Sequence, residues 1–192
     1  MEDIILIGGG GHCRSCIDVI ETQGKFRIAG IVDLPSKVGE SVLSYPIIGT
    51  DADLGALSEK YRNFHITIGH LRSPANRISL YKRLKALAVN FPQLISPNTH
   101  ISKHAVIGEG TVIMHGVIVN AGAKIGSNCI LNSHALIEHD AVVGDHCHIS
   151  TGAIINGGVV VGSGSFIGSG CVTKQYTVIP DHSFVQAHTF RQ

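Results

Sequence analysis

The side chains best suited to chemistry stand together at Glu138-His139-Asp140. A neutral histidine can take a proton from an attacking amine or hydroxyl because its pKa lies near working pH, and a neighbouring carboxylate can orient its ring. These residue types indicate general-base chemistry, with His139 as the base, Asp140 as the orienting carboxylate and Glu138 as the second choice. Position alone leaves a plainer interpretation open, in which His139 is a surface histidine and Asp140 a turn residue.

The twelve histidines and five cysteines suggest two other chemistries. His134 and His139 have the spacing of one ligand pair in the zinc site of γ-class carbonic anhydrases, but Asn98 stands where the third ligand should lie. Cys13 and Cys16 form a C-x-x-C pair that no second cysteine pair accompanies. We therefore expect no metal and keep the metalloenzyme as a minor alternative.

A glycine-rich turn, Gly8-Gly9-Gly10-Gly11-His12, follows the short apolar segment Ile4–Ile7. Glycine lets the backbone approach a phosphate closely, and the N-terminus of a following helix attracts the negative charge. An acidic residue after the next strand, here Asp33, can grip a ribose. The turn matches the dinucleotide-binding pattern at Gly8 and Gly10 but has Cys13 at the third position. A simple tight turn is therefore the competing interpretation.

Residues 1–90 alternate between predicted strands and helices. Besides Ile4–Ile7, strands are predicted at Arg27–Val32 and His65–Ile68, and helices at Cys13–Thr22 and Arg77–Ala88. This alternation is typical of a small, Rossmann-like α/β domain with a parallel sheet.

Residues 91–192 carry a six-residue repeat without any insertion. Fifteen of the sixteen positions found by stepping six residues from Ile95 to Val185 are aliphatic. Four residues after each of them the side chain is small, and three residues after it stand residues that tolerate positive φ. That last column contains Asn98, His104, Gly110, Gly116, Gly122, Asn128, His134, Asp140, His146, Gly152, Gly158, Gly164, Gly170, Tyr176 and His182.

Such a repeat describes a prism-shaped coil of three short strands joined by tight turns. Three hexads make one coil, so the fifteen hexads from Ile95 to Phe184 predict five coils. Each coil can bury its inner face only against its neighbours, as in other solenoids. The sequence therefore predicts a parallel β-helix.

Overall composition narrows the class of function. A formal net charge of +1, from 15 Lys+Arg and 14 Asp+Glu, provides no basic surface for nucleic acid. No stretch approaches a membrane span, and the start Met1-Glu2-Asp3 lacks the basic residues of a signal peptide. We expect a cytoplasmic protein with reduced thiols.

Both halves together resemble the NeuD/PglD-type sugar acyltransferases. The resemblance rests on Ile7–Arg14, Val32-Asp33, Ile68-Gly69 and Arg77, followed by hexapeptide repeats. It implies that the β-helix is left-handed, that the protein is a homotrimer with active sites between neighbouring prisms, and that the N-terminal domain binds a nucleotide sugar. The implied substrate-binding residues are Gly8, Gly10, His12, Asp33, Gly69 and His70.

The same resemblance implies roles in the repeat domain. Glu138-His139-Asp140 matches the stretch that contains the catalytic base of this family, which favours His139 as the base. His148 is implied to contact the acyl donor or acceptor, and the backbone N–H of Gly157 to face the thioester oxygen of acetyl-CoA. One departure stands out, because the segment Val185–Gln192 lacks the Gly-x-Pro-Ala-Lys-like pattern that closes the family's β-helix near coenzyme A.

We therefore expect an acetyl-CoA-dependent N-acetyltransferase that acts on a nucleotide-linked sugar, with a UDP-4-amino sugar as the first choice. An O-acetyltransferase acting on a sialic acid-like sugar stays open, because one base serves amines and hydroxyls alike. A non-catalytic β-helix scaffold is the alternative from another class, and the altered closing segment motivates it.

Overall fold

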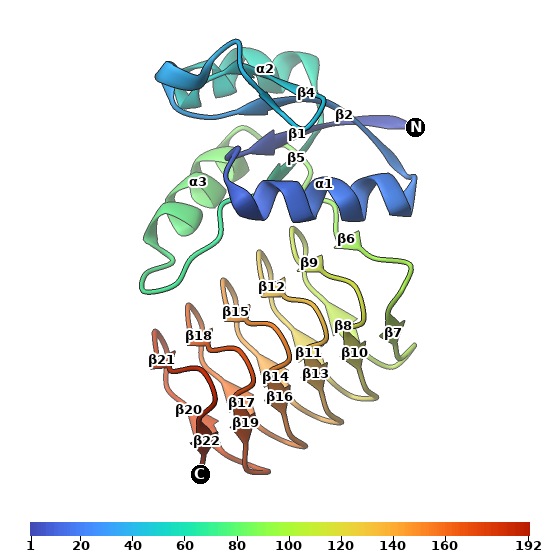
Figure 1. The fold of residues 1–192 in the computed structure, drawn as a ribbon, viewed down its shortest axis with the longest axis vertical. Coiled ribbons are helices and arrows are strands. Elements are labelled where there is room, and N and C mark those ends of the chain that lie inside the picture. Colours follow the sequence, from blue (N-terminus) through green and yellow to red (C-terminus); the bar gives the residue numbers. More distant parts are fainter.

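The structure is a computed structural model that describes all 192 residues. An N-terminal α/β part is followed by a parallel β-helix, which confirms the predicted fold class (Figure 1). None of the helices has the length and hydrophobicity that crossing a membrane requires.

A five-stranded sheet, in the order β3-β4-β2-β1-β5, forms the centre of the α/β part. Four neighbours are parallel: β1 (Glu2–Ile7), β2 (Phe26–Val32), β4 (Tyr45–Gly49) and β5 (Asn63–Ile66). The edge strand β3 (Ser41–Val42) pairs antiparallel with β4, so the sheet is mixed. Parallel strands are covered on both faces and read as apolar runs, which is why β1 is recognisable in the sequence and the half-exposed β3–β4 hairpin is not.

Three α-helices flank this sheet: α1 (Gly11–Gln23), α2 (Leu54–Lys60) and α3 (Ala75–Ala86). Two 3₁₀ turns, η1 (Pro35–Lys37) and η2 (Asp51–Asp53), complete the connections. The helix α1 ends at Gly24, whose φ of 65° is the left-handed cap that glycine adopts without strain. The first and last of the three helices correspond to the predicted ones, whereas α2 is too short to show a periodic pattern.

Seventeen two-residue strands, spaced six residues apart, build the β-helix. They form three parallel sheets in the orders β21-β18-β15-β12-β9-β6, β22-β19-β16-β13-β10-β7 and β20-β17-β14-β11-β8. In chain order the strands are β6 (Leu94–Ile95), β7 (His100–Ile101), β8 (Val106–Ile107), β9 (Val112–Ile113), β10 (Ile118–Val119), β11 (Lys124–Ile125), β12 (Ile130–Leu131), β13 (Leu136–Ile137), β14 (Val142–Val143), β15 (His148–Ile149), β16 (Ile154–Ile155), β17 (Val160–Val161), β18 (Phe166–Ile167), β19 (Val172–Thr173), β20 (Val178–Ile179), β21 (Phe184–Val185) and β22 (Phe190–Arg191).

Each strand pairs with the strand three hexads later, as Leu136 with Ile154 and Val142 with Val160 show. The non-glycine residues of the turn column from Asn128 onward have φ between 53° and 60°, which confirms the positive-φ turns there, whereas Asn98 and His104, in the first coil, do not adopt a positive φ. The regular coil continues through β22, beyond the predicted last hexad at Phe184. Aliphatic and small side chains, among them Cys129 and Cys147, fill the inside of the prism.

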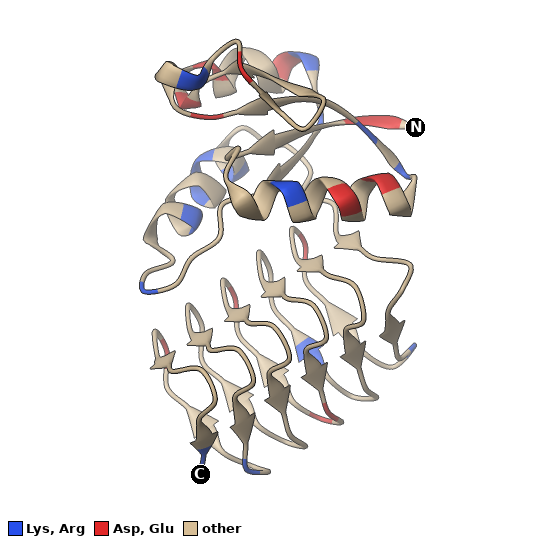
Figure 2. Cartoon of the chain, in the orientation of Figure 1, with Lys and Arg blue, Asp and Glu red and all other residues tan.

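The α/β part covers only the sheet that contains β6, β9 and β12 (Figure 1). The outward side chains of these strands, Leu94, Val112 and Ile130, are fully buried and pack into one cluster with residues of α1. Polar contacts reinforce the joint, since His115 Nε2 lies 2.7 Å from Asp18 Oδ2. Charged residues gather on the α/β part and are sparse on the β-helix, whose other two sheets are left uncovered (Figure 2).

Arg77 ties the two parts together from inside the molecule. Its side chain is fully buried, and its Nη1 donates to the Ile66 carbonyl at 3.0 Å. Its Nη2 donates to the backbone carbonyl and the side-chain oxygen of Asn128, at 2.8 and 2.7 Å. Burial lowers the pKa of Arg77 to about 10, so the guanidinium keeps its charge at neutral pH although no carboxylate faces it.

Candidate active site

His139 and Asp140 form a dyad on one edge of the prism. They occupy the turn between β13 and β14, and His139 Nδ1 lies 3.0 Å from Asp140 Oδ2. Both side chains are exposed, at 52% and 73% of their surface. Donation from Nδ1–H to the carboxylate leaves Nε2 with a lone pair that points away from the dyad. The pair therefore has the arrangement that a general base and its orienting group require.

Asp140 is also a turn residue, with φ of 59°. Its carboxylate covers Gly122 of the preceding coil, where any Cβ would collide with it. Glu138 does not contact the imidazole. Its Oε2 accepts from Asn120 Nδ2 at 2.9 Å and from the backbone N–H of His139 at 3.2 Å. The orienting contact thus belongs to Asp140, while Glu138 fixes the backbone of the turn.

Gly157 lies directly beneath the His139 ring, one coil further along the edge. A Cβ added to Gly157 would come within 2.7 Å of both Cε1 and Nε2 of His139. The N–H of Gly157 donates to no group of its own chain, whereas the next N–H, that of Gly158, donates to the His139 carbonyl at 3.0 Å. The structure therefore places the basic nitrogen of His139 next to an unpaired backbone donor, the N–H of Gly157. Such a donor is suited to stabilising a developing oxyanion.

A second group of predicted residues converges where the α/β part meets the β-helix. A cavity of about 330 Å³ there is lined by Gly11, His12, Ser15, Gly69, His70, Leu71, Asn132 and His148. His148, the outward residue of β15, donates from Nδ1 to the His70 carbonyl at 2.8 Å. This bond assigns the proton to Nδ1 and leaves Nε2, which lies 3.4 Å from Asn132 Nδ2, as an acceptor.

The histidines of this cavity are neutral at physiological pH. Burial lowers the pKa of His148 to about 4 and that of His70 to about 3, and the nearby Arg77 charge adds to both shifts. Burial likewise lowers the pKa of His12 to about 3. The cavity therefore offers uncharged hydrogen-bonding groups, and neither ring nitrogen of His70 has a partner within the chain.

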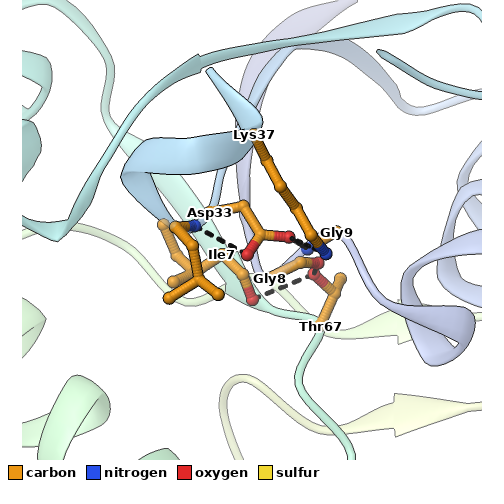
Figure 3. Close-up of polar contacts among 7 residues, drawn as sticks. Ile7, Gly8, Gly9, Asp33, Lys37 and Thr67 are labelled. Atoms are coloured by element: carbon orange, nitrogen blue, oxygen red, sulfur yellow. Dashed lines mark hydrogen bonds and ion pairs between the residues drawn. The ribbon is translucent and has the colours of Figure 1, made fainter. Parts of the chain in front are cut away.

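Asp33 and Gly8 line a different cleft, of about 450 Å³, at the carboxyl ends of β1, β2, β4 and β5. Asp33 Oδ2 accepts from the Gly9 N–H and Oδ1 from the Leu34 N–H, both at 2.7 Å, and Lys37 Nζ lies 3.5 Å away (Figure 3). The carboxylate thus holds the glycine turn in shape while it faces the cleft. Gly8 has φ of 102° and abuts Ile68, so no other residue fits there.

The structure divides the predicted substrate-binding residues between these two cavities. Gly8 and Asp33 line the cleft, whereas His12, Gly69 and His70 line the cavity with His148. Gly10 precedes α1 and lines neither. Sequence reasoning missed Asn132 and Ser15 in the second cavity, and Asn76, Ser79 and Arg83 of α3 in the cleft. The only available signal was that Ser79 and Arg83 stand four residues apart, on one side of the predicted helix Arg77–Ala88, whereas Asn76 precedes that helix.

The His139 edge and the two cavities lie on opposite sides of one chain. His139 stands in the turn between the two uncovered sheets, whereas His148 belongs to the sheet that faces the α/β part. In Figure 2 the acidic turn between β13 and β14 lies at the prism edge remote from the α/β part. No group of three His, Cys, Asp or Glu side chains lies close enough within the chain to hold a metal ion.

Comparison with protein families matches both halves of the chain. The PglD N-terminal domain model matches residues 3–84, and the GMPPB C-terminal domain model matches residues 89–191. Among curated proteins, UDP-N-acetylbacillosamine N-acetyltransferase from Bacillus subtilis is 33% identical over 116 residues, which are 59% of this chain and 52% of that protein. The chain spans 24% of the length of two similar proteins, the bifunctional GlmU proteins of Enterococcus faecalis and Bacillus velezensis.

Two solved structures resemble the whole chain. A histidine-to-asparagine mutant of perosamine N-acetyltransferase from Caulobacter crescentus, in complex with CoA and GDP-perosamine, is 28% identical and has a TM-score of 0.92. The match covers 99% of this chain and 88% of that one. The acetyltransferase domain of PglB from Neisseria gonorrhoeae, in complex with acetyl coenzyme A, is 28% identical with a TM-score of 0.88, and the match covers 99% and 92% of the two chains.

Proposed function

This chain belongs to the PglD-type family of sugar N-acetyltransferases with a hexapeptide-repeat β-helix, and on that premise we propose that it transfers the acetyl group of acetyl-CoA to the amino group of a nucleotide-linked sugar. The observation that carries the proposal is the exposed His139–Asp140 dyad, whose ring lies on Gly157 and so brings a base next to an unpaired backbone N–H. Relatives that bind CoA or acetyl-CoA support the choice of donor.

In the proposed reaction the sugar nitrogen attacks the carbonyl carbon of the thioester. His139 Nε2 takes the proton that the nitrogen loses, and the Gly157 N–H stabilises the oxyanion of the tetrahedral intermediate. The carbon–sulfur bond then breaks, and the thiolate of coenzyme A receives that proton from the imidazolium. Asp140 keeps the ring in the required tautomer throughout. General-base catalysis of this kind contributes a factor of about 100 to 10,000 in rate.

We place the nucleotide in the cleft of Asp33 and Gly8, and the sugar towards the cavity of His12, His70 and His148. The cavity is uncharged, which suits the hydroxyl groups of a sugar. A UDP-linked 4-amino sugar is our first choice of acceptor, in keeping with the UDP-sugar relative from Bacillus subtilis. All five cysteines are free and buried, which favours a reducing compartment, and we propose the cytoplasm.

We further propose that the enzyme is a homotrimer whose active sites combine two chains. Within one chain the base and the cavities lie on opposite sides of the prism, so a second chain must bring them together. Large apolar side chains point outward from the two uncovered sheets that flank the His139 edge: Val106, Ile118, Val160 and Val178, which are 39–70% exposed. Contact between neighbouring prisms would bury this surface.

Release of coenzyme A thiol in the presence of acetyl-CoA tests the proposal. UDP-4-amino sugars, the matching GDP-linked sugars and the corresponding 4-hydroxy sugars would be offered as acceptors, and the product analysed by mass spectrometry. We expect thiol release and an amide product with an amino sugar. Thiol release only with hydroxy sugars would indicate an O-acetyltransferase. If no acceptor gave thiol release, the non-catalytic β-helix scaffold would be the remaining hypothesis. His139→Ala should abolish turnover while the trimer persists.

A further inference from the structure

A series of hydrogen bonds links the middle of α1 to the first two coils of the β-helix. His115 Nε2 lies 2.7 Å from Asp18 Oδ2, and His115 Nδ1 lies 2.6 Å from Ser96 Oγ. A carboxylate only accepts, so Nε2 carries the proton that is donated to Asp18. In that tautomer Nδ1 accepts from the Ser96 hydroxyl, whose oxygen in turn accepts the Asn98 N–H at 3.0 Å. We call Asp18, His115 and Ser96 together the α1 bridge.

The residue types of the α1 bridge are those of a serine hydrolase triad, but its serine is not placed for nucleophilic attack. Ser96 is fully buried. Its backbone N–H donates to the Ile113 carbonyl at 2.9 Å, and its own carbonyl accepts from the Thr99 hydroxyl at 2.8 Å. A substrate therefore has no access to Ser96 Oγ, and the bridge is suited to holding two distant segments together.

The apolar contact between α1 and the β-helix does not select one alignment of the two. The outward residues of three adjacent coils are Leu94, Val112 and Ile130, which are all aliphatic and stand in register. A helix on such a repeating surface can shift by one coil and still bury its apolar side chains. Where packing is permissive in this way, directional polar contacts specify the register.

His115 interrupts the repeat at the position that meets Asp18. The equivalent positions in the coils before and after it are Pro97, which has no side-chain donor, and Ser133, whose side chain is shorter. Asp18 therefore keeps its contact in only one alignment of α1. The contact also lies on the opposite edge of the covered sheet from the turn that Arg77 binds, so the α/β part is tied to the β-helix at both edges.

The alignment of α1 determines which side chains face each other across the His148 cavity. Gly11, Ser15 and Asp18 recur at spacings of four and three residues, so they share one face of α1, and the first two line that cavity. From Ser15 to Asp18 the helix rises about 4.5 Å, close to the spacing of about 4.8 Å between coils, so successive turns of α1 meet successive coils (Figure 1). With Asp18 at the coil of β9, Ser15 meets the next coil, where Asn132 lines the same cavity.

We propose that the α1 bridge fixes the register of α1 along the β-helix and thereby positions the acceptor sugar for acetyl transfer. Asp18, His115 and Ser96 are positioning residues, because none of them lines either cavity. The proposal rests on the proposed function, which places the sugar in the His148 cavity. A shift of α1 would move one wall of that cavity against the other, whereas the nucleotide cleft is lined by the α/β part alone.

Steady-state kinetics of Asp18→Ala and His115→Ala, with acceptor and donor varied separately, test the proposal. We expect kcat/KM for the nucleotide-linked amino sugar to fall about tenfold or more, as a displacement of about 1 Å implies. KM for acetyl-CoA and the affinity for UDP alone, measured by calorimetry, should match the wild type. Because the two side chains are 32% and 65% exposed, the melting temperature should fall by no more than about 4 °C.

Glu21→Ala is the matched control, because Glu21 is another carboxylate on α1 with one hydrogen bond. That bond, from the Tyr45 hydroxyl at 2.9 Å, stays within the α/β part, so the kinetics of this variant should match the wild type. Asp18→Asn should recover most of the activity, since its amide oxygen still accepts from His115 Nε2. The double variant Asp18→Ala/His115→Ala should lose no more than either single variant, because both changes remove the same contact.

Wild-type kcat/KM in Asp18→Ala and His115→Ala, or an equal loss in Glu21→Ala, would overturn the inference. A wild type that acetylates no amino sugar would overturn the proposed function instead, and hydrogen exchange then tests the register without turnover. The backbone amides of α1 should exchange faster in His115→Ala than in the wild type or in Glu21→Ala. Equal exchange in all three proteins would show that the bridge does not hold the helix.

Discussion

At the scale of single residues, two carboxylates adjoin His139, but they make different contacts. Asp140 contacts Nδ1 of the ring at 3.0 Å, whereas Glu138 contacts the backbone N–H of His139 and the side chain of Asn120. Only the first contact changes the chemistry of the imidazole. The orienting role therefore belongs to the residue that also adopts the positive φ of the turn.

Asp140→Asn should lower kcat about tenfold with little change in stability. Asparagine tolerates a positive φ, so the turn survives, but an amide no longer stabilises the imidazolium that forms in the transition state. Glu138→Gln is the matched control and should retain most of the activity. Steady-state kinetics of both variants measure this difference in kcat. A larger loss of kcat in Glu138→Gln than in Asp140→Asn would assign the orienting role to Glu138 instead.

Buried neutral histidines make the folded protein sensitive to acid. Burial lowers the pKa of His65 and His70 to about 3 and of His148 to about 4, below the value of about 6.5 in the unfolded chain. Their contribution to stability is therefore fully present above pH of about 6.5 and is lost as the pH falls towards 4, because only the unfolded chain then binds the protons.

We accordingly expect the free energy of unfolding to fall by up to about 1.4 kcal/mol per pH unit for each of these histidines below pH of about 6.5. Urea unfolding at a series of pH values between 7.5 and 5 measures this slope. The side chain of asparagine is uncharged at every pH, so the His65→Asn variant should take up about one proton fewer on unfolding. The slope of its free energy of unfolding against pH should be smaller by the corresponding amount. A stability that stays constant over this range would contradict the assignment of neutral buried rings.

At the scale of elements, the lattice of the β-helix determines which residues meet. Positions three hexads apart stack, so Ala121, His139 and Gly157 form one column along the edge. Gly157→Ala would place a Cβ 2.7 Å from two atoms of the His139 ring and push the base aside. We expect a fall in kcat of at least tenfold with an unchanged melting temperature, since Ala121 shows that the column accommodates alanine.

The six-residue spacing is why much of this domain could be predicted from the sequence. It places every turn, every inward side chain and the contact between His139 and Gly157, because each depends only on neighbours at fixed separation. The cavity of His12, His70 and His148 could not be derived in the same way. It depends on how α1 and the loop after β5 dock on the sheet of β15, and no periodic pattern encodes that contact between distant segments. The β3–β4 hairpin and α2 were missed for the lack of a sufficiently long apolar pattern.

The docking of the two parts depends on Arg77, which links the end of β5 to a turn of the β-helix. Arg77→Ala would leave the carbonyls of Ile66, Ile68 and Asn128 without their donor inside the protein. We expect a loss of about 3 kcal/mol in the free energy of unfolding, measured with urea. Arg72→Ala, on the exposed loop before α3, is the control and should change it by less than about 0.5 kcal/mol. Equal stability of the two variants would show that the buried guanidinium is dispensable.

At the scale of the whole molecule, one chain separates the parts of its proposed active site. His139 lies on the edge between the two uncovered sheets, and the cavity with His12 lies on the covered sheet. Outward apolar side chains such as Val160 and Val178 are placed so that a neighbouring prism could cover them. Val160→Lys should therefore weaken the proposed trimer and, with it, activity, although Val160 belongs to neither cavity.

Mixed trimers test whether active sites are shared between chains. His139→Ala lacks the base and His12→Ala lacks a cavity side chain, so each variant alone should be nearly inactive. If each site takes its base from one chain and its cavity from the next, trimers reassembled from equal amounts of the two variants contain intact sites at about one in four positions. Thiol release should then return to about a quarter of the wild-type rate after the mixture is dissociated and reassembled, but not after simple mixing of preformed trimers. Because a site within a single chain would always contain one of the two substitutions, failure to recover activity in verified mixed trimers would show that each chain uses its own base.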